Sequence, residues 1–293
     1  MFLKITDCDN FYLTWQYISS FADQIMMTCD ENGIDMKVMT PGQNGLASIA
    51  FPAIYFDEYK CENHMNIGLV SKVFVSILKS CYKKDVTLKI DAKNNDEINV
   101  SIEESNFVCS YTLKCTNVEG PEFSIPDIDY DAVYDISTDT LKQWKDLLYD
   151  KDLSFTPMKK QIRIESYDDG DDAASNRVAL TGNVVPTEFK KKKWKKQTLI
   201  SSHAKNVYSL LPFGKDIKFL FKNNGEQPIH VSVALNKDVT LHSFFAAKTE
   251  DDEEEEAEKA GDETKKRKNK SDDEPTKKKK KVTKKRSKTV PAN

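Results

Sequence analysis

Lysines recur on the polar side of three segments whose apolar residues follow a helical period. These lysines are Lys72, Lys79, Lys83, Lys142, Lys145 and Lys205. An ammonium group can contact a phosphate without reading any base, so such a surface binds nucleic acid in a sequence-independent, salt-dependent way. No glutamate lies on these stripes to form the usual ion pair one turn away. A solvated helix face explains any single lysine, whereas the repetition predicts a phosphate-contacting surface.

A second basic element is a run of six lysines around one tryptophan, from Phe189 to Lys196. Lysines beside an aromatic side chain are typical of nucleic-acid binding, because a base can stack on the ring. We therefore add four residues to the candidate DNA contacts: Lys190, Lys191, Lys192 and Lys193. The alternative is a solvated basic loop whose Trp194 packs on its own domain.

Charge is concentrated at the C-terminal end. Residues 249–293 hold 15 Lys+Arg and 13 Asp+Glu without an aromatic residue, which predicts a disordered tail. Basic blocks such as Lys265–Lys268 and Lys277–Lys281 resemble nuclear localisation signals or phosphate-binding arms. The remaining 29 basic and 34 acidic residues give the body a net charge of −5, so it must gather its lysines on one face to attract DNA.

The sequence offers little for an enzyme or a metal site. Its four histidines are scattered without cysteine or carboxylate partners at ligand spacing, and no phosphate-binding loop, dinucleotide fingerprint or nucleophile elbow occurs. The six cysteines form no zinc-site spacing, and we expect reduced, buried thiols. Asp168–Asp172 lacks the last ligand of a calcium loop and favours an acidic hairpin tip. We expect no catalytic residue, no metal and no cofactor.

Membrane association is not expected either. No apolar run approaches the ~20 residues of a membrane helix, and Met1–Asp7 lacks the regions of a signal peptide.

An internal repeat organises the body. Asp85–Ile90 is echoed by Asp216–Phe221, and the helical pattern around Trp15 is echoed around Trp144. Each half reads as one strand, a helix, three strands, a second helix and three strands. Runs of strands with only two helices per half predict an α+β fold with antiparallel sheets. We expect domains at 1–117 and 131–248, a connector at 118–130 that contains two prolines, and a tail at 249–293.

Several segments resemble eukaryotic proliferating cell nuclear antigen. They are Phe56–Cys61 (Phe-Asp-Glu-Tyr-Lys-Cys), Ile77–Lys79 with Asp85–Leu88, Val118–Glu119 with Ile125–Tyr130, and Phe244–Lys248 running into the acidic Glu250–Glu254. The resemblance covers about residues 1–254 and is weak over 150–200. It implies the DNA clamp fold: a homotrimeric ring around duplex DNA, with helices inside, that serves as a polymerase processivity factor. The implied partners are DNA polymerase, other proteins with clamp-interaction peptides, and a clamp loader.

The resemblance also implies site residues. The partner pocket would comprise Met39, Leu46, Phe123, Ile125, Pro126, Pro228, Phe244 and Ala246. Subunits would join through edge strands at Phe107–Cys115 and Arg177–Thr181, with contacts from Tyr111, Leu113, Val178 and Leu180. The alternative for each pocket residue is an ordinary core or turn position.

Three features depart from the family: the basic loop, the basic tail, and a first helix whose expected exposed residues (Thr14, Gln16, Tyr17 and Ser20) carry no charge. Together they indicate a divergent clamp, for which a large DNA virus is one fitting source. The implied location is the nucleus or a cytoplasmic viral replication compartment. An alternative stays open: a clamp-fold protein diverted to DNA-bound transcription, or a subunit of a heterotrimeric checkpoint-type clamp.

Overall fold

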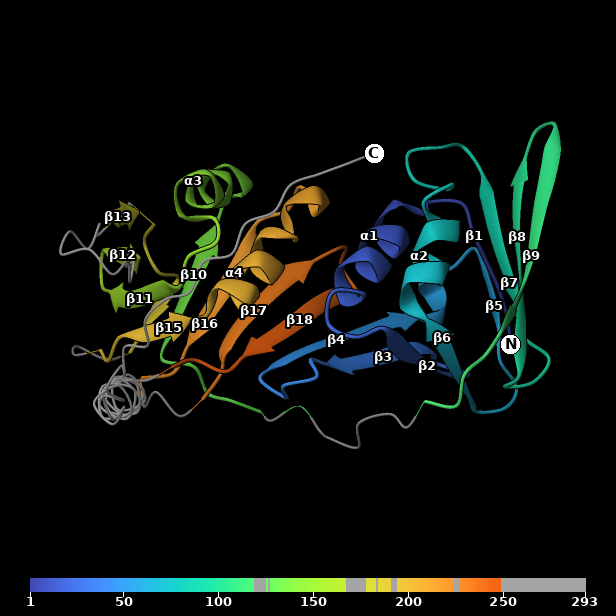
Figure 1. Cartoon of the computed structure of the whole chain (residues 1–293), viewed down its shortest axis with the longest axis horizontal. Helices are drawn as coiled ribbons and strands as arrows, with labels where there is room; N and C mark the ends of the chain where they lie inside the picture. The colour runs from blue at the N-terminus through green and yellow to red at the C-terminus, as the bar shows by residue number, and fades with distance from the viewer. Residues whose placement is uncertain are drawn as a thin grey trace, which may run out of the picture. The chain divides into compact units, whose positions relative to one another are not determined.

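The apolar periods become four helices that lie on one side of a long antiparallel sheet in the computed structural model (Figure 1). The structure describes residues 1–118, 125, 127–166, 184–190, 194–223 and 227–248, together with the backbone of 178–182. No helix among these residues is long and apolar enough to cross a bilayer. The predicted disordered tail and the acidic segment Asp168–Asp172 lie outside the described residues.

The first half contains two α-helices, α1 and α2, and nine strands. Its elements are β1 (Phe2–Ile5), α1 (Asp9–Ile18), β2 (Gln24–Asp30), β3 (Gly33–Met39), β4 (Gly45–Pro52), the 3₁₀ turn η1 (Ala53–Tyr55), β5 (Glu58–Lys60), β6 (Met65–Val70), α2 (Ser71–Leu78), β7 (Thr87–Asp91), β8 (Glu97–Glu104) and β9 (Phe107–Lys114).

The second half repeats this order. Its elements are β10 (Ala132–Ile136), α3 (Thr138–Leu148), β11 (Leu153–Met158), β12 (Gln161–Ser166), β13 (Val178–Gly182), β14 (Glu188–Phe189), β15 (Gln197–Leu199), α4 (Ser201–Tyr208), the 3₁₀ turn η2 (Leu211–Phe213), β16 (Ile217–Phe221), β17 (Ile229–Ala234) and β18 (Thr240–Phe245). The prediction of three strands between the helices of each half was wrong, because five strands lie there.

Three antiparallel sheets result, as the α+β prediction requires. The central sheet has nine strands in the order β14-β10-β16-β17-β18-β4-β3-β2-β6, and smaller sheets flank it with the orders β5-β1-β7-β8-β9 and β13-β12-β11-β15. The last strand, β18, pairs with β4 from Leu241 opposite Ile49 to Phe245 opposite Gly45. The C-terminal strand of the second half therefore continues the sheet of the first half.

Both echoed tryptophans lie in the core. Trp15 of α1 is fully buried and its ring meets Phe74 of α2 edge-on, with centroids 4.5 Å apart. Trp144 of α3 is 3% exposed and meets Phe219 of β16 edge-on at 6.0 Å. Such an aromatic pair contributes ~1 kcal/mol beyond the burial of its apolar surface. The internal repeat is therefore visible in packing as well as in sequence.

The first helix is more deeply covered than expected. Thr14 and Tyr17 were predicted to be exposed, but both are buried, while Gln16 and Ser20 are exposed. The Tyr17 hydroxyl forms a 2.7 Å hydrogen bond with Ser243 Oγ of β18. Because β18 pairs with β4 under α1, it covers a side of the helix that a single amphipathic stripe would leave to solvent.

Among the four α-helices of the described residues, only α3 has a side-chain N-cap. Ser137 Oγ accepts a hydrogen bond from the Thr140 N–H at 3.2 Å at the start of α3. Asp9 instead accepts from the backbone N–H of Lys83, at 2.7 Å. At the start of α4, Asp152 Oδ1 accepts from the Ser201 N–H at 2.6 Å. At α4, a carboxylate distant in sequence therefore takes the place of a local cap.

Candidate functional site

An apolar cavity of about 270 Å³ brings together five of the eight predicted pocket residues: Met39, Leu46, Pro228, Phe244 and Ala246. The strand register explains the grouping, because Leu46 of β4 lies opposite both Met39 of β3 and Phe244 of β18. Ile125 is half-buried and is not among the lining residues, whereas Phe123 and Pro126 lie outside the described residues. The cavity can hold a small apolar group of a ligand.

The turn between β3 and β4 forms one rim of this pocket. Thr40 Oγ1 accepts from the Gly45 N–H at 3.0 Å and donates to Asn44 Oδ1 at 2.9 Å. The Asn44 carbonyl accepts from the Ala246 N–H at 2.8 Å, which fastens the segment after β18 to the same turn. The rim is therefore held in place before any ligand arrives, which reduces the entropy lost on binding.

Behind Phe244, one of the residues that line the pocket, lies a pair of histidines that the sequence did not reveal. His230 of β17 stacks on Phe244 with centroids 4.3 Å apart and planes 13° apart. Its Nε2 lies 3.0 Å from Nδ1 of His242, so one imidazole donates to the other. The two histidines thus contact each other rather than a cysteine or a carboxylate. Burial, followed by the charge of His242, lowers the pKa of His230 to about 3, and burial also lowers the pKa of His242.

Acid should therefore destabilise the pocket. An unfolded histidine takes up a proton near pH 6.5, but His230 in the folded chain does so only near pH 3. Between these values the unfolded state binds more protons, so the free energy of unfolding falls as the pH drops. The contribution of neutral His230 to this free energy is fully present above about pH 6.5. Urea denaturation at pH 7.5 and 5.0 measures this loss. His230→Phe should reduce the loss, and His64→Gln, at an exposed histidine, should not. An equal loss in His230→Phe would contradict the assignment.

All six predicted helix lysines are exposed. They lie on α2 or just after it (Lys72, Lys79, Lys83), on α3 (Lys142, Lys145) and on α4 (Lys205). The helices that carry or precede these lysines share one side of the sheet (Figure 1). The grouping fits a surface for an extended polyanion.

Carboxylates partner three of these lysines, one from the same helix and two from outside the helices. Lys72 pairs with Asp23 at 2.7 Å, Lys142 with Asp139 at 3.4 Å, and Lys205 with Asp150. The hydrogen bond to Asp150 raises the pKa of Lys205. Exposed ion pairs contribute only ~0–1 kcal/mol, so a phosphate can compete for each ammonium group.

In the basic loop, the structure places Lys190 against the end of the connector, where it pairs with Asp129. Hydrogen bonding to Asp129 raises the pKa of Lys190 and lowers that of the carboxyl group. Trp194 is half-buried against Phe189, as the alternative for this loop expected. Lys191, Lys192 and Lys193 lie outside the described residues.

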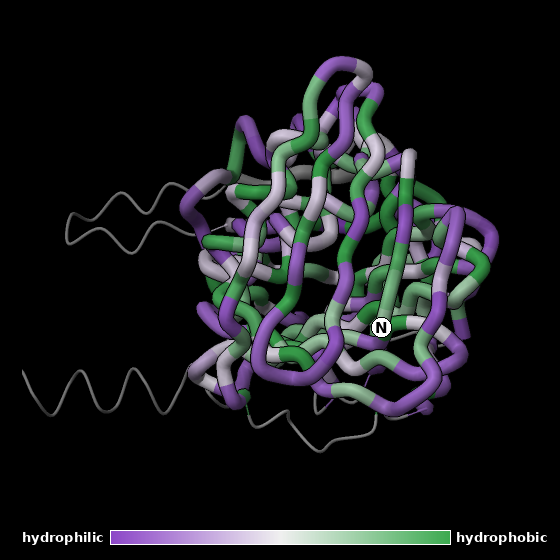
Figure 2. Tube along the Cα trace, turned by 90° about the vertical axis from the view of Figure 1, so that its right-hand side faces the viewer, coloured by the Kyte–Doolittle hydropathy of each residue, from purple (hydrophilic) through white to green (hydrophobic). Residues whose placement is uncertain are grey.

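Both predicted edge strands lie at the end of a sheet within the described part of the chain. β9 is the last strand of the five-stranded sheet, and β13 is the last strand of the four-stranded sheet. Figure 2 views the five-stranded sheet from the β9 side, where polar and apolar residues alternate along the strands. On β9, Phe107 is 51% and Tyr111 36% exposed, whereas Leu113 is half-buried. Only the backbone of Val178 and Leu180 is described, on β13.

Among the described residues no group of histidine, cysteine and acidic side chains could hold a metal ion. Four cysteines are buried and free, as expected, while Cys109 and Cys115 are half-buried and also free.

Comparison with known proteins supports the resemblance over the first half of the chain. Residues 15–122 match the family model described as proliferating cell nuclear antigen, N-terminal domain. A probable DNA polymerase sliding clamp of Autographa californica nuclear polyhedrosis virus is 27% identical over 143 residues, which cover 48% of this chain and 56% of the viral one. Proliferating cell nuclear antigen 2 of Drosophila melanogaster is 21% identical over 76% of this chain and 87% of its own length. The chain spans about half the length of the first curated relatives it matches.

Solved structures support the fold over nearly the whole body. Proliferating cellular nuclear antigen of Entamoeba histolytica superposes with a TM-score of 0.72 at 19% identity, covering 84% of this chain and 98% of that one. A PCNA2–PCNA3 complex of Sulfolobus tokodaii gives 0.71 at 18% identity and covers 85% and 99%. In sequence over its first half and in fold over its body, this chain is therefore similar to proliferating cell nuclear antigen.

Proposed function

We propose that the chain is a DNA sliding clamp: a homotrimeric ring that encircles duplex DNA and tethers a DNA polymerase and other partners by their peptides. The observation that carries the proposal is the separation of three surfaces on one fold. Lysines occupy the helix side, open strand edges end the two smaller sheets, and an apolar pocket lies at the β3–β4 turn.

This arrangement suits sliding rather than tight binding. Exposed lysines attract phosphates without base contacts, so the free energy of binding changes little as the protein moves along the duplex. Head-to-tail pairing of two different edges closes a ring when the rotation per subunit is right. In such a ring the DNA is held topologically, and strong contacts are unnecessary. The chain would then act without catalysis, at replication sites in the nucleus or in a viral compartment, and a clamp loader would open the ring. Residues 1–117 and 131–248 would form its two domains.

The proposal is tested by retention on DNA. Loaded wild-type protein should stay on nicked circular DNA and leave when the circle is cut, because a linear end lets a ring slide off. Equal retention on circular and linear DNA would contradict encirclement.

The basic tail should add to the recruitment of DNA. Each neutralised phosphate adds about 0.9 to the slope of log affinity against log salt for duplex DNA. A chain ending at Lys248 should therefore show a flatter slope and weaker binding to linear duplex, with trimerisation unchanged. Changing Lys72, Lys79, Lys142 and Lys145 to Gln should flatten the slope further. Fluorescence anisotropy at several salt concentrations measures both, and equal slopes with and without the tail would mean that the tail does not contact DNA.

A heteromeric ring is the second candidate. One structural relative is a complex of two different clamp chains, PCNA2 and PCNA3. A wild-type chain that is monomeric alone, but trimeric with a second clamp chain, would favour this candidate over the homotrimer.

A further inference from the structure

A second cavity, of about 620 Å³, lies between β14 and the turn that joins β11 to β12. Its lining residues are Thr156, Pro157, Met158, Lys159, Phe189, Lys190 and Trp194. It shares no lining residue with the pocket at the β3–β4 turn, and none of its lining residues belongs to a helix. The proposed duplex-binding lysines and the proposed peptide pocket therefore leave this cavity unexplained.

Aromatic side chains form one wall of the cavity. The rings of Phe189 and Trp194 have centroids 5.6 Å apart and planes inclined by 38°. Met158, which is 37% exposed, contributes an apolar surface from the opposite turn. Aromatic and thioether groups in one open cavity suit a flat, polarisable ligand such as a nucleobase.

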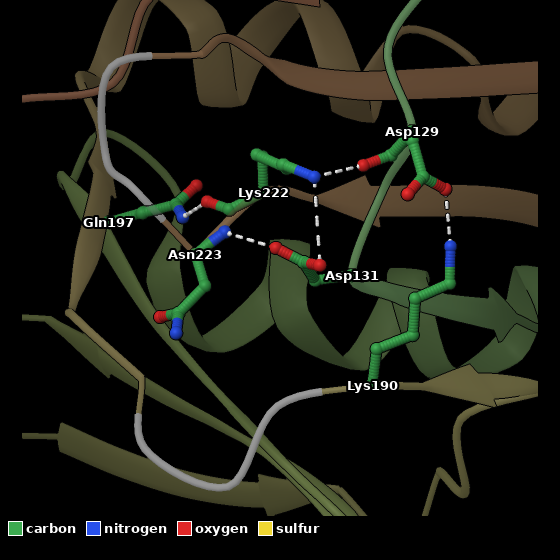
Figure 3. A network of polar contacts seen from close by, with 6 residues as sticks. All are labelled: Asp129, Asp131, Lys190, Gln197, Lys222 and Asn223. Carbon is green, nitrogen blue, oxygen red and sulfur yellow. Dashed lines mark hydrogen bonds and ion pairs between the residues drawn. The ribbon is translucent and has the colours of Figure 1, made fainter.

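Hydrogen bonds hold the residues on both sides of the basic loop, and Figure 3 shows the part of the network that joins Asp131 to Asn223. The Lys190 N–H donates to the Asp131 carbonyl at 2.8 Å, on one side of the loop. On the other side, the Lys195 N–H donates to Asn223 Oδ1 at 3.2 Å. The Asn223 N–H donates to Asp131 Oδ2, also at 3.2 Å. One buried aspartate therefore positions both ends, and Phe189 and Trp194 are held together without a ligand.

The opposite wall is fixed as well. The Tyr134 hydroxyl donates to the Met158 carbonyl and accepts from the Met158 N–H, both at 2.8 Å. Tyr134 is itself fully buried in the core. The turn that presents Lys159 and Lys160 is thus anchored to the central sheet, so a ligand would meet a preorganised site.

Positive charge surrounds the aromatic wall. Lys159 and Lys160 are exposed on the turn, and Lys195 is exposed beside Trp194. No carboxylate of the described residues pairs with these three ammonium groups. Lys190 is paired with Asp129, and the nearby Glu188 is exposed, so the positive potential is strongest toward the other three lysines.

We propose that this aromatic–lysine cavity binds single-stranded nucleic acid. A base would stack at Trp194 and Phe189, while the phosphates before and after it meet lysines on the two walls. A duplex hides the faces of its bases and would not fit this arrangement, so the site is distinct from the helix side. The site lies within one chain and does not depend on ring formation.

The test uses the full-length chain and a fluorescein-labelled twelve-residue oligothymidine. Trp15 and Trp144 are buried, so Trp194 is the tryptophan that a base can reach, and the unlabelled oligonucleotide should quench its fluorescence. Trp194→Ala should weaken binding about tenfold, the usual scale for one base–aromatic stack. Lys159→Gln with Lys160→Gln should lower the salt slope by about 1.4, at ~0.7 for each single-strand phosphate.

Matched controls separate this site from the others. Tyr149→Ala removes a 49% exposed aromatic ring at the end of α3 and should leave oligothymidine binding unchanged. Trp194→Ala should also leave duplex binding unchanged. If Trp194→Ala lowers the melting temperature, the exposed Lys159 and Lys160 variants still decide the question. The proposal is overturned if the oligonucleotide does not quench, if all site variants bind it normally, or if a glutamate-rich peptide displaces it and binds more tightly. Loss of trimerisation or of duplex retention would count against the clamp proposal alone.

Discussion

A chain carrying Phe107→Ala and Tyr111→Ala should elute as a monomer, whereas the wild-type chain should elute as a homotrimer. Both aromatic side chains stand exposed on β9, whose outer side has no partner strand among the described residues. An aromatic cross-strand pair contributes up to ~1 kcal/mol beyond main-chain pairing. Each ring would have three such interfaces, and every interface would lose the contacts of both the Phe107 and the Tyr111 side chain. Size-exclusion chromatography with light scattering distinguishes one 33.4 kDa chain from three.

Ile54→Ala is the matched control for this experiment. Ile54 is a large apolar residue, 82% exposed, in η1 and away from both open edges. Its loss should leave the trimer intact. A trimer that survives the double substitution at β9 would mean that these side chains do not hold the subunits together. A monomeric wild-type chain at micromolar concentration would reject the homotrimer itself.

The helices and longer strands could be predicted because each repeats one pattern over many residues. The stripe from Val70 to Cys81 contains α2, and the alternating segment Ile34–Met39 lies within β3. The strands β5 and β14 were missed because they have three and two residues, too few for alternation to be recognised. Local sequence patterns therefore identify long elements and miss the shortest ones.

Burial on the first helix depended on distant residues. Thr14 and Tyr17 have no local signal for burial, and the covering strand β18 lies more than 200 residues away in sequence. The histidine pair shows the same limit. His230 and His242 become neighbours because β17 and β18 pair with His230 opposite Phe244 and Ser232 opposite His242. Knowing that register would have revealed the contact, since diagonal residues on adjacent strands touch.

The pocket was predicted by resemblance alone. Nothing in the spacing of Met39, Leu46, Pro228 and Phe244 brings them together; the pairing of β4 with both β3 and β18 does so. The lysines, by contrast, were found from their helical period and are exposed as expected. Two of their acidic partners, Asp23 and Asp150, were missed because they lie outside the helices concerned, whereas Asp139 lies within α3.

The pocket should lose its partner peptide when a charge replaces its central apolar residue. Leu46 is half-buried and lies between Met39 and Phe244 in the sheet, so Leu46→Glu places a carboxylate among apolar side chains. A peptide that inserts an apolar group there would have to desolvate that charge, which costs several kcal/mol. We expect at least a hundredfold loss of affinity in calorimetry for a peptide bearing the clamp-interaction motif. Phe244→Ala is less informative, because Phe244 is only 6% exposed and stacks on His230, so its removal also costs stability.

Two comparisons show whether that loss belongs to the pocket. Ile54→Glu adds the same charge at a highly exposed position and should bind the peptide as the wild-type chain does. Leu46→Met keeps an apolar side chain of similar volume and should retain affinity within about a few-fold. Both variants and Leu46→Glu should melt within a few degrees of the wild-type chain, because Leu46 borders open space rather than the closed core. Unchanged affinity in Leu46→Glu at an unchanged melting temperature would place the peptide site elsewhere on the chain.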